Sequence, residues 1–265
     1  MATALPRAAF YETHQDWSPE AAAAIAGHLR ASTPAARTAA FLGCASGVND
    51  ALPFARRAPD VRVLASDVEP DYLHALAARA EGMSNLEIRK VDVTADLPSL
   101  EPVDLVAIFF VVHRLPAWEG VVPPLTRLVA PGGRLFTSEF AGPGGVIYRS
   151  NENGGRADDP VSRLIRRCFE LRSEPFAPPL RSTRMGPFLD ALGRALVPAG
   201  HRDFAWPQSL TVEEMHRKIE TGAHAPFFLR PSRAILDRLR DEFSGEWTAR
   251  VDLTETIRIH QFRRA

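Results

Sequence analysis

The sequence predicts an α/β protein built on a doubly wound parallel sheet, and three observations lead to that expectation. Short apolar runs alternate with helical patterns along the first half of the chain, after one leading helix. The run over 103–112 is continuously apolar and contains β-branched residues, as in a strand buried on both faces of a parallel sheet. A length of 265 residues suits one α/β domain that carries an insertion.

The elements of the first half follow in order. A helix is expected directly after Ser18, which suits the N-cap and is followed by proline at the first helical position. Pro131-Gly132-Gly133 is expected to turn the chain into the fifth strand. The predicted strands span 38–42, 61–65, 86–91, 103–112 and 134–140, and the predicted helices between them span about 48–57, the stretch after Pro70, and 116–128.

The second half is expected to carry the insertion. Residues 141–160 are rich in glycine and predict a loop. Helices are expected after Asp159, around Phe188 to Leu196, after the capping box Thr211 to Glu214, and after Ser232. Strands over 202–206 and 250–262 are expected to pair and close the chain. We therefore expect three parts: a core over 1–140, a helical and loop lid over 141–200, and terminal strands over 201–265 with a helical cap at about 211–245.

Charge and composition exclude several classes of function. The 32 basic and 32 acidic residues cancel, so neither a nucleic-acid partner nor an anionic membrane surface is expected. Two cysteines are too few for a disulfide framework or a thiolate metal site, and we expect no bound metal. No apolar leader opens the chain, and its longest apolar run, 105–112, is far too short to span a membrane; we expect a cytoplasmic protein.

Small residues occupy alternate positions at the end of the first predicted strand, at Gly43, Ala45 and Gly47. A side chain there would fill space that a close ligand could use, and glycine also permits unusual backbone dihedrals. The following helix would offer free N–H groups to a carboxylate or phosphate. A tight turn without any ligand explains these residues equally well when they are taken alone.

Acidic residues follow the next two predicted strands. Asp67 comes after the second strand, where an acid can accept both hydroxyls of a ribose. Asp92 comes after the third strand, in the layer from which an adenine amino group can be reached. Each acid alone also suits a helix cap or a turn. Together, three strands that end in ligand-binding residue types favour a ligand at the carboxyl edge of the sheet.

The chain here resembles the class I S-adenosylmethionine-dependent methyltransferases, well over residues 8–140 and more loosely beyond. Residues 43–47 match the end of the family's G-x-G-x-G motif, with Ala45 in place of the middle glycine, and 128–133 resembles its L-x-P-G-G turn. The segment 141–245 resembles the insertion of the trans-aconitate methyltransferase-like small-molecule branch. The resemblance implies a Rossmann-like sheet of seven strands with the last antiparallel, S-adenosylmethionine as cofactor, and S-adenosylhomocysteine as product.

The resemblance also implies individual site residues. Tyr11 and His14 match an N-terminal segment that lies over the cofactor, although Gln15 stands where the family usually has arginine. The cofactor-binding residues that it implies are Tyr11, Gly43, Cys44, Ala45, Gly47, Asp67, Val68, Asp92, Val93, Phe109 and Phe110.

Methyl transfer from a sulfonium requires mainly that acceptor, methyl group and sulfur be aligned. A hydroxyl acceptor also needs a base, whereas a carboxylate does not. His113 and His14 are the candidate bases; His113 alternatively packs on the edge of the cofactor. The candidate substrate-binding residues are Trp17, Tyr148, Met215 and His224, of which Met215 is equally consistent with a core position.

The leading hypothesis is methyl transfer to a hydroxyl or carboxylate oxygen of a small molecule, an intermediate of secondary or general metabolism. One alternative is a nonmethylating reaction, such as a cyclisation or elimination, with the cofactor bound. Another is a noncatalytic binding module without cofactor affinity. A dinucleotide oxidoreductase is disfavoured because Val48 stands where G-x-G-x-x-G needs glycine. The sequence identifies neither the acceptor nor the oligomeric state.

Overall fold

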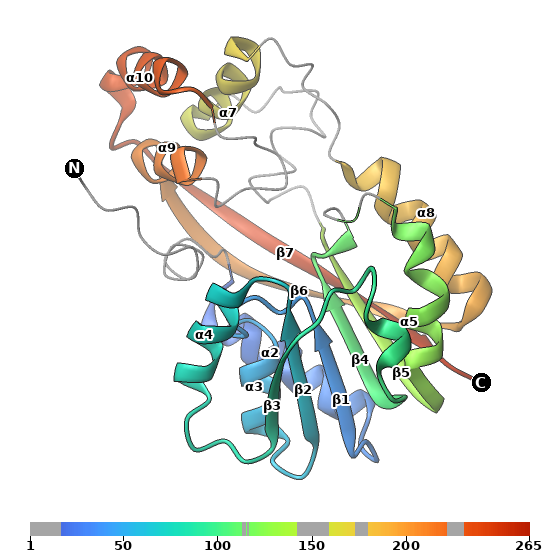
Figure 1. Cartoon of the computed structure of the whole chain (residues 1–265). Helices are drawn as coiled ribbons and strands as arrows, with labels where there is room; N and C mark the ends of the chain where they lie inside the picture. The colour runs from blue at the N-terminus through green and yellow to red at the C-terminus, as the bar shows by residue number, and fades with distance from the viewer. Residues whose placement is uncertain (1–16, 113–114, 116, 142–158, 173–179, 222–230) are drawn as a thin grey trace.

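A computed structural model of the chain describes residues 17–112, 115, 117–141, 159–172, 180–221 and 231–265. These residues contain one seven-stranded sheet with the order β3-β2-β1-β4-β5-β7-β6 (Figure 1). The first five strands are parallel, and β7 runs antiparallel to both β5 and β6. The predicted doubly wound sheet with an antiparallel last strand is therefore confirmed. The strands are β1 (Thr38–Leu42), β2 (Arg62–Asp67), β3 (Leu86–Lys90), β4 (Val103–Phe109), β5 (Val129–Phe140), β6 (Val197–Thr211) and β7 (Arg250–Arg263).

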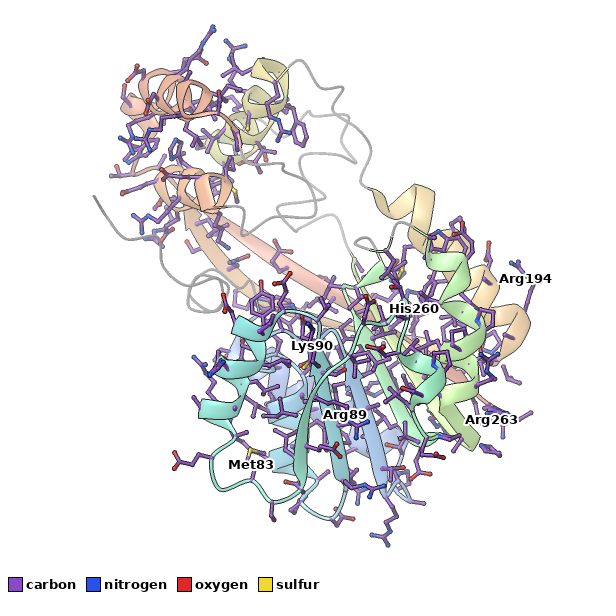
Figure 2. The ribbon with its side chains drawn as sticks, viewed as in Figure 1. Met83, Arg89, Lys90, Arg194, His260 and Arg263 are labelled. Atoms are coloured by element: carbon purple, nitrogen blue, oxygen red, sulfur yellow. The ribbon has the colours of Figure 1, made fainter. Side chains whose placement is uncertain are left out.

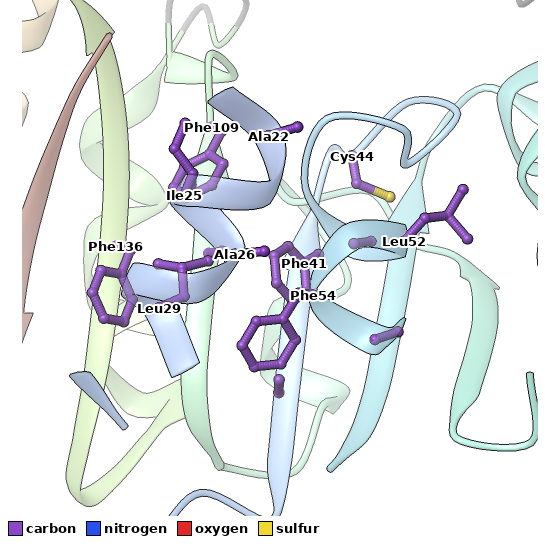
Figure 3. Packing of buried hydrophobic residues seen from close by; sticks show 14 of the residues in the cluster. Ala22, Ile25, Ala26, Leu29, Phe41, Cys44, Leu52, Phe54, Phe109 and Phe136 are labelled. Carbon is purple, nitrogen blue, oxygen red and sulfur yellow. The ribbon is translucent and has the colours of Figure 1, made fainter. Parts of the chain in front are cut away.

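Three helices cover one face of the sheet: α2 (Pro19–Ser32), α3 (Ala51–Arg57) and α4 (Pro70–Arg79). Helix α2 begins as predicted, because the Ser18 hydroxyl accepts a hydrogen bond from Ala21 N at 3.0 Å. Ile25 and Leu29 on α2 pack with Phe41 of β1 and are inaccessible to solvent (Figure 3). We call this assembly the first core cluster; it also includes Trp17, Phe109, Phe136, Phe204, Trp206 and Ile257.

Helices α5 (Val122–Leu128) and α8 (Leu180–Ala195) cover the other face. Phe188 and Leu192 of α8 are fully buried in a second core cluster with Ile108 of β4 and Leu125 of α5. The prediction that residues 141–200 form a lid is therefore wrong for α8. The apolar stripe of this helix lies against the sheet and α5, which makes it part of the core.

A third apolar cluster, the cap cluster, joins α7 (Pro160–Leu171), α9 (Val212–Thr221) and α10 (Arg233–Glu242). The predicted capping box opens α9: Thr211 N donates to Glu214 Oε2 at 2.7 Å, and Glu214 N donates to Thr211 Oγ1 at 3.1 Å. Figure 1 shows these three helices beyond the sheet, where the paired strands β6 and β7 carry them.

Strand β7 connects the two halves of the molecule. Its second half pairs with β5, from Phe140↔Ile257 to Arg134↔Arg263, while β6 pairs with it along nearly its whole length. On this shared portion, His260 Nε2 and Glu139 Oε1 lie 2.8 Å apart across β7 and β5 (His260 is labelled in Figure 2). The predicted strand over 202–206 is thus only the middle of a far longer element.

Several predicted boundaries differ from the observed ones, and proline or positive φ explains two of them. The helix predicted over 116–128 is a short 3₁₀ turn, η3 (Trp118–Gly120), followed by α5, because prolines at 123 and 124 suit the first turn of a helix and not its interior. Strand β4 ends at Phe109 because Phe110 adopts a φ of +54°. The helix predicted from 48 begins at Ala51.

The Pro131-Gly132-Gly133 segment, predicted as a turn before the fifth strand, lies within β5 as an irregularity. The pairing with β4 jumps from Val103↔Val129 to Leu105↔Arg134 at this point. The remaining elements are the 3₁₀ turns η1 (Leu97–Ser99) and η4 (Ser244–Glu246), the second of which follows α10. Among the described residues, no helix combines the length and the apolar character that crossing a membrane requires.

Candidate active site

The carboxyl ends of four parallel strands meet along one edge of the sheet, in the order β3, β2, β1, β4. The pairs Asp67↔Lys90 and Leu42↔Ile108 mark this edge, and Figure 2 labels Lys90 at its β3 end. Asp92, Asp67 and the loop over 43–50 therefore follow one another along the edge, with Phe110 beyond them. The structure thus brings together the residues that the sequence placed after separate strands.

Asp67 links the end of β2 to the loop that follows β1. Its Oδ2 accepts a hydrogen bond from Ala45 N at 2.8 Å, and its Oδ1 accepts one from Glu69 N at 3.0 Å. The side chain is buried, with 7% of its surface exposed. Because a carboxylate has about four acceptor sites, these two bonds leave capacity for the hydroxyls of a ribose.

Every second residue from 43 to 47 in the loop after β1 has a left-handed backbone conformation: Gly43 (φ +67°), Ala45 (φ +50°) and Gly47 (φ +71°). A Cβ at Gly43 would lie 2.5 Å from Val111 Cγ2, and one at Gly47 would lie 2.6 Å from Leu76 Cδ1. The space that a side chain would take at these two glycines is thus filled by the protein itself, and the predicted contact of the loop with a cofactor stays a prediction. Backbone conformation and neighbouring apolar side chains require them.

The groups of Cys44 are directed into the protein. Its N–H donates to Ser66 O at 3.0 Å, and its thiol is buried (Figure 3). Burial, with a smaller contribution from the charges of Asp50 and Asp67, raises the pKa of the thiol well above its ordinary value. The predicted contact of Cys44 with the cofactor is thus not made through its backbone N–H or a thiolate.

Two buried polar groups of this loop were missed by the sequence-based reasoning. The Ser46 hydroxyl is fully buried and has no hydrogen-bond partner among the described residues. Burial raises the pKa of Asp50 to about 7, opposed by its hydrogen bond from Ala51 N and reinforced by the charge of Asp67. Burying an unpartnered hydroxyl and a desolvated carboxyl destabilises the folded protein. A polar, cationic ligand that bound beside them would offset this cost.

The end of β3 offers a different surface. Asp92 Oδ1 accepts hydrogen bonds from Thr94 N at 2.8 Å and Thr94 Oγ1 at 2.6 Å, and these bonds lower the pKa of Asp92. Val68 is 45% exposed after β2, whereas Val93 is buried in the second core cluster. An exposed apolar side chain and a carboxylate that follow neighbouring strands suit a heterocyclic base with an amino group.

The end of β4 carries an aromatic group in a strained conformation. Phe110 has a φ of +54°, and its N–H donates to Ser138 Oγ on β5 at 3.2 Å. Trp17, at the start of α2, packs against Phe109 and Phe110 with ring centroids 6.3 and 5.7 Å apart. A bulky residue with positive φ is rare and occurs preferentially at functional sites. Trp17 therefore lies beside the same edge as the predicted cofactor residues.

Of the remaining predicted site residues, the structure describes Met215 alone. Met215 is fully buried among α7, α9 and α10, so it packs in the cap cluster and exposes no surface to a substrate. Its helical spacing with Ile219 explains this position. Tyr11, His14, His113, Tyr148 and His224 lie outside the described residues.

Comparison with known proteins agrees with this geometry. The model of a methyltransferase domain family matches residues 42–135, the segment that contains the edge. A demethylmenaquinone methyltransferase from Thermus thermophilus is 36% identical over 116 residues, 41% of this chain and 52% of the relative. The chain thus spans about half the length of this relative.

Solved structures share the fold at low sequence identity. The YcgJ protein from Bacillus subtilis superposes with a TM-score of 0.55 and 14% identity, over 94% of this chain and 100% of that protein. A structure described under the conversion of a disulfide bond into a thioacetal group during echinomycin biosynthesis superposes with a TM-score of 0.54 and 15% identity, over 91% of this chain and 80% of that protein. Residues 42–135 therefore match a methyltransferase domain, which supports the predicted resemblance to the class I S-adenosylmethionine-dependent methyltransferases. The chain's predicted place in the trans-aconitate branch stays a prediction.

Proposed function

We propose that this chain is an S-adenosylmethionine-dependent methyltransferase that methylates an oxygen of a small molecule. The observation that carries the proposal is the hydrogen bond from Ala45 N to the buried Asp67 carboxylate. It joins the loop after β1 to the end of β2. The Thermus thermophilus relative is by name a demethylmenaquinone methyltransferase, which supports a small-molecule acceptor.

The described residues fit the cofactor in three places. Asp67 would accept the ribose hydroxyls, Asp92 and Val68 would flank the adenine, and the buried Asp50 would offset positive charge on the methionine portion. When bound, the cofactor supplies a methyl group that its sulfonium has already activated. The chain then has to fix the loop, hold Phe110 through Ser138, and exclude water from the edge.

Titration calorimetry with S-adenosylmethionine and S-adenosylhomocysteine tests the proposal on wild type, Asp67→Ala and Asp67→Asn. Removing the carboxylate deletes its hydrogen bonds to the ribose and to Ala45 N, each charge-assisted. We expect Asp67→Ala to weaken binding about 100-fold, which corresponds to about 2.7 kcal/mol, and Asp67→Asn to lose less.

Asp71→Ala is the matched control, because Asp71 is an exposed carboxylate four residues along, in the first turn of α4. It should bind both ligands as wild type does. A wild-type protein that binds neither ligand would contradict the proposal, and so would equal losses in Asp67→Ala and Asp71→Ala.

A further inference from the structure

Two buried carboxylates, Asp50 and Asp67, lie at the cofactor edge without a cationic partner. Asp50 is 8% exposed and Asp67 is 7% exposed. Among the residues that the structure describes, neither forms an ion pair with a lysine, an arginine or a histidine. Burying a charge in this way is unfavourable unless an opposite charge or hydrogen bonds compensate for the lost water. The edge therefore favours a ligand that brings a positive charge.

The loop after β1 folds tightly where it reaches Asp50. Leu52 N donates to Gly47 O at 2.9 Å, so the chain turns directly into α3. Asp50 is the N-cap of this helix, and its Oδ1 accepts a hydrogen bond from Ala51 N at 2.5 Å. Within the described part of the chain, the groups that offset the burial of this carboxylate are backbone N–H groups. They compensate only in part, because burial still dominates the ionisation of Asp50.

The titratable groups around Asp50 all oppose its negative charge. Burial raises the pKa of Asp50 to about 7, and the charge of Asp67 at the end of β2 adds to this effect. The Cys44 thiol also faces Asp50, and burial together with both carboxylates raises the pKa of that thiol. A positive charge that approached this group of residues would lower the pKa of Asp50 again.

The proposed cofactor would bring such a charge to the loop after β1. Asp92, Asp67 and this loop follow one another along the edge, from β3 through β2 to β1. With the adenine at Asp92 and the ribose at Asp67, the sulfonium attached to the ribose comes next, over the loop that ends at Asp50. Methyl transfer converts the sulfonium into a neutral thioether. The edge therefore faces one positive charge fewer after the reaction than before it.

We propose that Asp50 makes this edge select its ligand by charge, so that it binds S-adenosylmethionine more tightly than S-adenosylhomocysteine; this inference rests on the proposed function. Asp50 releases its proton to solvent when the cationic cofactor binds, and it takes up a proton from solvent once the sulfonium charge is gone. Its charge acts through the interior of the protein, where screening is weak, so it needs no contact with the sulfur. Loss of this attraction after methyl transfer favours release of the product.

The first test measures the Kd of three ligands at pH 7.5 by titration calorimetry: S-adenosylmethionine, S-adenosylhomocysteine, and sinefungin, whose ammonium group replaces the sulfonium. A nearby opposite charge lowers the pKa of a carboxyl by about 1–3 units, and each unit is a tenfold change in affinity above both pKa values. Wild type should therefore bind the two cationic ligands about tenfold more tightly than S-adenosylhomocysteine. In Asp50→Asn this preference should disappear.

Asp71→Asn is the matched control, because it removes the same charge from an exposed position in the first turn of α4. It should keep the wild-type preference. Asp67→Ala gives a second contrast: it removes hydrogen bonds to the ribose, which all three ligands share, and should weaken all three. Only Asp50→Asn should weaken the cationic ligands while leaving S-adenosylhomocysteine unchanged.

The second test follows protons and needs no variant that folds. At pH 7 about half of the Asp50 side chains carry a proton, so binding of S-adenosylmethionine should release about half a proton. Binding enthalpies in phosphate and in Tris buffer measure this release. Because the pKa of Asp50 falls on binding, the gain in affinity is complete above pH 7 and is lost on acidification. The Kd for S-adenosylmethionine should rise about tenfold from pH 7.5 to pH 5.5, and in Asp50→Asn it should stay nearly constant.

Failure of this inference can be told apart from failure of the proposed function. A wild-type protein that binds S-adenosylmethionine and S-adenosylhomocysteine equally, or without proton release, overturns the role of Asp50 and leaves the cofactor site standing. An Asp50→Asn variant that keeps the wild-type preference does the same. If that variant does not fold, the proton release of wild type decides the question. A protein without affinity for either ligand overturns both.

Discussion

The cofactor edge and the cap are held together by different forces. At the edge, the Asp67 carboxylate accepts hydrogen bonds from the backbone N–H groups of Ala45 and Glu69, and three residues of the loop after β1 have positive φ. In the cap, α7, α9 and α10 share an apolar cluster, and Arg167 pairs with Glu242 at its surface. The edge therefore depends on backbone stereochemistry and hydrogen bonds, and the cap depends on packed volume. A substitution that alters backbone conformation should therefore affect the edge, and one that removes packed volume should affect the cap.

The largest effect is expected from Gly43→Ala at the edge. A left-handed alanine costs about 1–2 kcal/mol, and its Cβ would overlap Val111 Cγ2, which adds about 1–3 kcal/mol. We expect a loss of roughly 3 kcal/mol in the free energy of unfolding, measured by urea denaturation, together with weakened cofactor binding. Gly82→Ala is the control, because Gly82 has a φ of +80° but no atom lies within 4 Å of the position that a Cβ would take there. Equal losses in the two variants would mean that the contact with Val111 is unimportant.

Met215→Ala should act on the cap alone. It leaves a cavity in a fully buried site, which costs roughly 2–3 kcal/mol. We expect faster amide hydrogen exchange in α7, α9 and α10, with an unchanged Kd for S-adenosylmethionine. Leu29→Ala, in the first core cluster, is the comparison and should accelerate exchange in α2 and the neighbouring strands. Faster exchange throughout the sheet of Met215→Ala would show that the cap does not open independently.

The smallest effect concerns the pH dependence that Asp50 gives to the edge. Its folded pKa of about 7 lies above the value of 3.8 for the free side chain, so the folded state binds more protons between these values. The associated stability is complete below about pH 4 and is lost as the pH rises through 7. Asp50→Asn should therefore flatten this dependence and raise stability at pH 8 by roughly 2 kcal/mol, at 1.36 kcal/mol per pKa unit and allowing for relaxation.

Thermal denaturation between pH 2 and 8, without cofactor, measures this difference. Asp92→Asn is the control with the opposite sign, because hydrogen bonds from Thr94 lower the pKa of Asp92. The stability that this residue contributes is present above about pH 4 and is lost on acidification. A wild-type protein whose stability does not fall between pH 4 and 8 would contradict the role given to Asp50.

Much of the sheet and of the cofactor edge could be predicted from local patterns. The apolar runs of the parallel strands are bounded by turn residues; Asp67 is the last residue of β2, and Asp92 follows shortly after β3. Capping signals are local as well, so Ser18 and Thr211 were placed correctly from their neighbours in the sequence. Parallel strands end at a common edge, which is why residues after separate strands could be assigned to one site.

The reasons behind the small residues could not be predicted in the same way. Gly43 meets Val111 and Gly47 meets Leu76, contacts between residues 68 and 29 positions apart in sequence. The helical pattern of Phe188 and Leu192 likewise showed that a helix forms, without showing which apolar surface it covers. A periodic apolar stripe specifies burial and leaves the partner open.

The sequence by itself determined the alternation of strands and helices, the family resemblance of residues 43–47, and the carboxylates at the ends of β2 and β3. Only the tertiary structure decided that α8 belongs to the core, that Met215 packs inside the cap, and that Asp50 is buried near Asp67. The physical reason is that hydrogen-bonding and dihedral preferences act between near neighbours. Burial of a side chain depends on which distant surfaces the whole chain brings against it.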